Sequence, residues 1–173
     1  PAIVQPYRDL IEQARQIGVD AAYRPWLAPE LLDEWVAADW EAKRSMLAER
    51  REEVLDPDVA AVLATGLEAD PDDPDLVIHA ALLALARIDR AALAFDALPD
   101  PDRIPTLLAD LARAGDSAAL EPMTRLLLQL QLPDPIRAAV WFHRAIALAL
   151  ESQPQDALSA VQEARRLDSR QGG

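Results

Sequence analysis

The chain has 173 residues, of which 51% are hydrophobic and 27% charged, a size and composition typical of a folded domain and not of a disordered segment. It contains no cysteine, which excludes disulfide scaffolds, thiolate nucleophiles and cysteine-ligated zinc. The formal net charge of −13 argues against binding to a nucleic-acid backbone or to an anionic membrane surface.

The composition predicts an all-α fold. Alanine and leucine, which favour helices, dominate the sequence, whereas β-branched and aromatic residues are scarce. Aspartate followed by proline recurs along the chain, and this pair suits the first turn of a helix because aspartate caps the free amides and proline fits the next position. The expected helices are 5–17, 29–38, 40–54, 57–68, 74–88, 90–98, 102–114, 117–131, 135–151 and 154–167. Their connections are short, so consecutive helices should pack as antiparallel hairpins.

The N-terminal third contains three closely spaced tryptophans, Trp26, Trp35 and Trp40. We interpret them as capping one end of a helical stack, although an interface or a ligand pocket is the alternative. No signal-peptide core and no run of about 20 apolar residues is present, so the expected location is the cytoplasm. The mixed charges from Glu49 to Glu53 favour a solvated helix face.

The C-terminal half contains a repeat. The segment Leu98-Pro99-Asp100-Pro101 recurs 34 residues later as Leu132-Pro133-Asp134-Pro135. The second copy leads into a pattern of an aromatic followed by small residues: Trp141, Ala145, Ala157 and Ala164. Small residues at such positions allow two helix backbones to approach closely.

Residues 134–169 resemble a tetratricopeptide repeat (TPR), whose period is 34 residues. Arg144 and Leu148 depart from the usual leucine and tyrosine, and the preceding segments are more degenerate. The resemblance implies a right-handed α-solenoid of stacked hairpins. It divides a single domain, 1–173, into an N-terminal helical cap (1–56), degenerate repeats (57–132) and the best TPR-like unit (134–169). We expect Leu158, Val161 and Ala164 to face inward from the last helix.

A second resemblance covers residues 30–97, including the segment Trp40-Glu41-Ala42-Lys43-Arg44-Ser45 and the apolar run that follows His79. It is similar to helical segments found beside TPR arrays in actinobacterial proteins that often end in a caspase-like CHAT peptidase domain. The peptidase His/Cys pair is absent from this chain, which has no cysteine.

Catalytic patterns are lacking. The two histidines, His79 and His143, lie within apolar helical segments, which favours packing roles over metal or acid–base chemistry. No serine lies in a nucleophile-elbow motif, and no glycine-rich phosphate loop is present. We therefore expect no enzymatic activity, no metal and no cofactor.

The first helix of the best repeat offers a candidate binding surface. By the TPR resemblance, its inner face is mostly apolar, and Arg137 and Arg144 share one side of it. This basic pair could receive an acidic peptide group, or it could pair with Asp134 or Glu151. The expected partner-binding residues are Arg137, Phe142, His143, Arg144 and Ile146.

The leading functional hypothesis is a non-catalytic scaffold that binds a protein or peptide partner on the concave face of the stack. Two alternatives remain open. The chain could be a self-associating domain, such as a homodimer, or a regulatory domain of a larger CHAT-type signalling protein. It could also be an all-α enzyme or small-molecule binder that uses the tryptophans and histidines.

Overall fold

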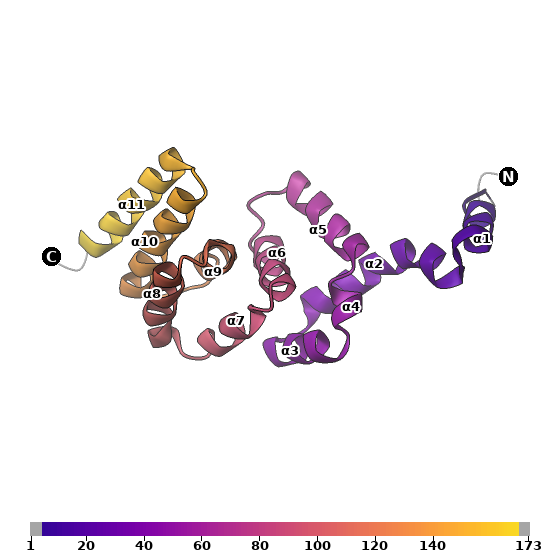
Figure 1. The fold of residues 1–173 in the computed structure, drawn as a ribbon, viewed down its shortest axis with the longest axis horizontal. Coiled ribbons are helices and arrows are strands. Elements are labelled where there is room, and N and C mark those ends of the chain that lie inside the picture. The colour runs from indigo at the N-terminus through magenta and orange to yellow at the C-terminus, as the bar shows by residue number, and fades with distance from the viewer. Residues whose placement is uncertain (1–4, 170–173) are drawn as a thin grey trace. The chain divides into compact units, whose positions relative to one another are not determined.

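The computed structural model describes residues 5–169, and all of the regular secondary structure in that range is helical (Figure 1). The expected all-α class is confirmed. The chain divides into two compact units, residues 1–69 and residues 70–173. The division after residue 69 differs from the boundary expected after residue 56, because the helix at 57–69 packs against the helix at 19–37 within the first unit.

The first unit contains α1 (Gln5–Ile17), α2 (Val19–Ala37), α3 (Trp40–Glu49), α4 (Arg51–Val54) and α5 (Pro57–Ala69). Helix α2 is its centre, since α1, α4 and α5 all pack against it. Its core includes Trp35, Val54 and Val59, which are almost fully buried. The segment expected as one helix at 40–54 is interrupted at Arg50, which separates α3 from α4.

Helix α2 begins ten residues earlier than the sequence indicated, at Val19 in place of residue 29. Pro25 and Pro29 lie inside it. Each proline removes one backbone hydrogen bond and normally disfavours a helix interior. Burial of Ala22 and Ala28 within this segment opposes that cost.

The second unit contains α6 (Pro74–Arg87), α7 (Ala91–Ala97), a short 3₁₀ helix η1 (Pro101–Arg103), α8 (Ile104–Ala114), α9 (Ser117–Leu128), α10 (Asp134–Leu150) and α11 (Pro154–Ser169). Helix α9 packs against α6, α8 and α10, and α10 also packs against α8 and α11. The α9 side chains Leu120, Met123, Leu126 and Leu127 are fully buried. Helix α9 is thus the centre of this unit's core.

Local capping explains several helix ends. Asp73 accepts hydrogen bonds from the amides of Asp75 (2.9 Å) and Leu76 (3.1 Å) at the start of α6, with Pro74 in the first turn. Asp116 caps α9 through the amide of Ala119 (3.2 Å). Gly115 ends α8 in the left-handed conformation (φ 68°), which glycine adopts without a steric cost. The Asp100–Pro101 pair opens only η1 and makes no side-chain cap.

The last two helices form a hairpin and lie side by side in Figure 1. Ala145 and Leu148 of α10 pack against Ala160 of α11, and Trp141 and Ala157 border this cluster. The expected inward position of Leu158 is wrong, because its side chain is 60% exposed. The other two expected positions are confirmed, since Ala164 is buried and Val161 packs against the cluster, and Ala160 and Leu167 complete the buried face of α11.

Candidate functional site

Helix α10 holds all five residues expected to bind a partner, and the structure separates them by exposure. Arg137 is exposed, Phe142 is 52% exposed and Ile146 is half-buried. His143 and the neighbouring Val140 are buried. The solvent-facing part of the expected site is therefore Arg137 together with Phe142.

The exposed Phe142 ring contacts the ring of its neighbour in the sequence. It meets the His143 ring edge to face, with centroids 5.4 Å apart and an interplanar angle of 86°. The Nδ1 atom of His143 donates a hydrogen bond to the backbone oxygen of Ala139 (2.8 Å), because a carbonyl can only accept. His143 is thereby anchored to its own helix, and its ring lies nearly perpendicular to the exposed Phe142 ring.

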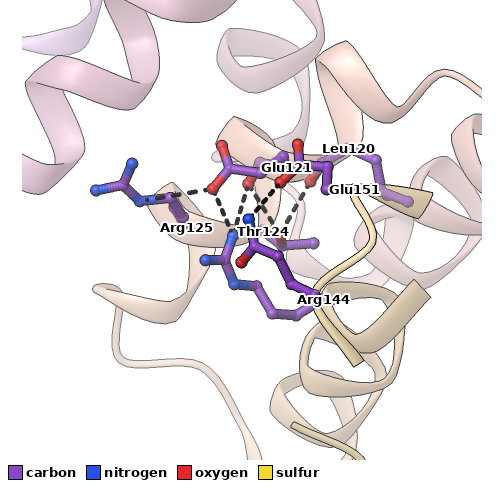
Figure 2. Close-up of polar contacts among 7 residues, drawn as sticks. Leu120, Glu121, Thr124, Arg125, Arg144 and Glu151 are labelled. Carbon is purple, nitrogen blue, oxygen red and sulfur yellow. Dashed lines mark hydrogen bonds and ion pairs between the residues drawn. The ribbon is translucent and has the colours of Figure 1, made fainter. Parts of the chain in front are cut away.

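Arg144 is engaged inside the unit (Figure 2). Its guanidinium donates to the carboxylate of Glu121 on α9 (2.8 Å) and to the Glu121 backbone oxygen (3.3 Å). Both side chains are about one-fifth exposed, at 18% and 22%. Arg125 adds a longer contact to the same carboxylate (3.8 Å). Arg144 thus links α10 to α9, and its partner is neither Asp134 nor Glu151.

The same region carries a second buried polar contact. The Thr124 hydroxyl donates to the backbone oxygens of Leu120 and Glu121, each at 2.9 Å (Figure 2). The Glu121 carbonyl therefore accepts from both Thr124 and Arg144. Among the residues described, no ion pair forms at Arg137, so the two arginines expected to act together have different environments.

The histidines sit as expected for packing residues. His79 and His143 are 5% and 8% exposed, and each ring nitrogen Nδ1 contacts the backbone oxygen four residues earlier. No group of three or more metal-ligating side chains occurs within the described range 5–169. Within the same range, none of the helices combines the length and the apolar character needed to cross a membrane.

Two of the three N-terminal tryptophans surround the chain's only lysine. The Lys43 ammonium lies 5.9 Å from the ring centroid of Trp35 and 5.6 Å from that of Trp40. It also donates to the backbone oxygens of Val36 (3.1 Å) and Ala38 at the end of α2. This cluster was not foreseen, although a lysine three residues after Trp40 is a usable signal once a helix start at Asp39 is recognised.

The first unit contains a cavity of about 460 Å³ that the sequence did not indicate. It lies between α2, α4 and α5, and its apolar wall is formed by Leu27, Ala28, Leu31 and Val59. The acidic side chains that line it are Glu30, Glu34, Glu52, Glu53 and Asp56. Only two basic side chains, Arg24 and Arg50, oppose them.

Both arginines of the cavity are paired. Arg50 contacts Glu34 (2.7 Å) and Glu53 (2.9 Å), and hydrogen bonds to Glu34 first and Glu53 second raise the pKa of Arg50 above its usual value. Arg24 lies 3.8 Å from Asp56. The cavity arises because α2 is helical through residues 19–28, which brings Arg24 and Leu27 onto the same side as Leu31.

Comparisons of the chain with protein-family profiles, with curated proteins and with solved structures found no match. The two candidate binding surfaces of the described chain are the exposed side of α10 and the cavity of the first unit.

Proposed function

We propose that the chain is a non-catalytic interaction module that binds a segment of another protein on the exposed side of α10. One observation carries the proposal: the Phe142 ring is 52% exposed on a helix whose opposite side is buried against three neighbours. A large aromatic side chain left in solvent is the kind of residue that contributes most to protein interfaces.

A TPR-like arrangement of the second unit is part of the proposal. The repeated Leu-Pro-Asp-Pro segments precede two successive hairpins, α8–α9 and α10–α11. Helix α10 packs against both helices of the preceding hairpin, as expected when each repeat buries its apolar face on its neighbour. In the segment 74–98, α6 packs against α9, the second helix of the following hairpin. This segment matches the TPR-like pattern least well.

The two arginines of α10, Arg137 and Arg144, have different roles in the proposed binding face. Arg144 holds α10 on α9 through Glu121 and gives the binding face its position. Arg137 is exposed and is the cation that can meet an acidic group of the partner. Binding on this face then depends mainly on burial of Phe142, because Arg137 lies five residues earlier and about 140° around the helix from it.

The experiment compares Phe142→Asp with Leu158→Asp. Leu158 is 60% exposed on the other helix of the same hairpin, so its replacement introduces the same charge without altering the proposed face. Proteins captured from the host lysate by the wild type are identified, and the purified candidate is titrated against each variant. The proposal requires the Phe142 variant to lose binding, by roughly 2 kcal/mol or more, and the Leu158 variant to retain it.

A homodimer is the second candidate, because an exposed aromatic on a rigid helix also suits an isologous contact. Light scattering at increasing concentration distinguishes the two. A mass that doubles for the wild type and for Leu158→Asp, but stays monomeric for Phe142→Asp, would assign the face to self-association.

A further inference from the structure

The cavity between α2, α4 and α5 combines an apolar wall with an unbalanced acidic rim. It has three more carboxylates than guanidiniums, and Arg24 and Arg50 are already paired with Asp56, Glu34 and Glu53. Within the described part of the chain, Glu30 and Glu52 are exposed and make no ion pair. Two carboxylates are therefore available at the rim of the cavity.

Apolar side chains extend this cavity along α2. Leu27, which lines it, is 55% exposed, while Tyr23 and Trp26 are 43% and 53% exposed. Tyr23 precedes Leu27 by four residues and Trp26 precedes Glu30 by four, so each lies one helical turn away on a neighbouring position of the same surface. The surface therefore presents aromatic and aliphatic side chains next to free carboxylates.

We propose that this surface, formed by Tyr23, Trp26, Leu27, Glu30 and Glu52, docks a basic amphipathic helix of another protein. The apolar side of the incoming helix covers Leu27 and Trp26, and its arginines or lysines meet Glu30 and Glu52. Charge complementarity selects this occupant. An acidic segment would place further carboxylates against an acidic rim, and a second copy of a chain with a net charge of −13 is repelled over the same surface.

This inference is independent of the proposed role of α10. The docking surface belongs wholly to the first unit, whereas Phe142 belongs to the second. Loss of one binding activity therefore leaves the other intact, and Phe142→Asp should not alter binding at the α2 surface.

The probe is a fluorescent helical peptide of about 16 residues with leucine and tryptophan on one side and arginine on the other, at a net charge of about +5. Fluorescence anisotropy measures its affinity for the full chain. Glu30→Gln with Glu52→Gln should weaken binding roughly two- to thirtyfold, because each removes one exposed charge contact. Leu27→Gln should weaken it about tenfold through lost apolar burial.

The matched control is Glu41→Gln with Glu49→Gln. These two exposed carboxylates lie on α3 of the same unit, outside the cavity lining, and their replacement changes the net charge by the same amount. Circular dichroism confirms equal helicity for all variants. The proposal expects the control to bind the peptide as tightly as the wild type.

Several results would overturn the proposal. Equal weakening by the two double variants would assign the affinity to the overall negative charge. Equal binding of a peptide in which serine replaces leucine and tryptophan would show that apolar contact does not contribute to the affinity. Tighter binding of a peptide with glutamate in place of arginine would show that the surface prefers acidic over basic segments. A change of oligomeric mass in Leu27→Gln would identify the occupant as a second copy.

Discussion

Replacement of Lys43 tests whether a buried cation holds the first unit together. Lys43 is 4% exposed, and its ammonium bonds the backbone oxygens of Val36 and Ala38, which end α2 and have no amide partner in a following turn. The rings of Trp35 and Trp40 lie under the same charge. Lysine thus serves as a C-terminal cap that reaches back from α3.

The expected effect follows from opposing contributions. Hydrogen bonds from a charged donor contribute about 1.5–3 kcal/mol each, and a cation–π contact contributes about 1 kcal/mol. Burial of an ammonium opposes them by several kcal/mol, a cost that methionine avoids while retaining the length of the stem. Lys43→Met should therefore destabilise the unit by about 2 kcal/mol, which corresponds to a melting temperature lower by roughly 10 °C.

Urea unfolding followed by tryptophan fluorescence measures this change, since three of the four tryptophans belong to the first unit. A second assay uses the single lysine as a chemical reporter. An amine-acylating reagent should modify native Lys43 roughly a hundredfold more slowly than the urea-unfolded chain, because reaction requires local opening. Peptide mapping separates this site from the N-terminal amine.

Two results would refute the reasoning. If Lys43→Met unfolds at the wild-type urea concentration, the hydrogen bonds to Val36 and Ala38 contribute no net stability. If native Lys43 is acylated as fast as in the unfolded chain, the side chain is not enclosed by Trp35 and Trp40. Lys43→Ala provides the comparison, since it also removes the packed stem and should cost more than methionine.

Three further changes test the second unit. In a double-mutant cycle of Glu121→Gln and Arg144→Met, chemical denaturation should give a coupling energy of about 1–2 kcal/mol, above that of exposed pairs because both side chains are about one-fifth exposed; a coupling near zero would mean that the pair does not hold α10 on α9. Ala145→Leu should overpack the α10–α11 hairpin and lower its stability by about 1–3 kcal/mol, whereas a neutral result by thermal unfolding would contradict close packing there. Asp73→Ala should cost about 1 kcal/mol through loss of the α6 cap, with Asp73→Asn retaining most of it in the same measurement.

Local chemistry explains what could be foreseen. Asp73 with Pro74 marks the start of α6, and Gly115 followed by Asp116 marks the end of α8 and the start of α9. These signals act within one turn of backbone, so they can be recognised in the sequence without knowledge of distant residues. The alanines near Trp141 similarly indicated the tight hairpin at the C-terminus, where Ala145 and Ala160 are buried.

Tertiary structure decided the features that depend on partners far along the chain. Asp134 and Glu151 lie closer to Arg144 in the sequence, yet Arg144 pairs with Glu121, which is 23 residues away. The cavity beside Leu27 exists because packing on α1 and α5 sustains α2 through Pro25 and Pro29, against their local preference.

The division has one physical reason. Helix caps, glycine turns and amphipathic periods depend on short-range interactions that are set by the residue types themselves. Which charge is paired, which cation is enclosed and which apolar side chain stays in solvent depend on burial, and burial exists only after distant helices have packed. For this protein the sequence by itself determined an all-α chain and most of its helix starts. The assembled units decided that Phe142 and Leu27 are exposed while Lys43 is buried.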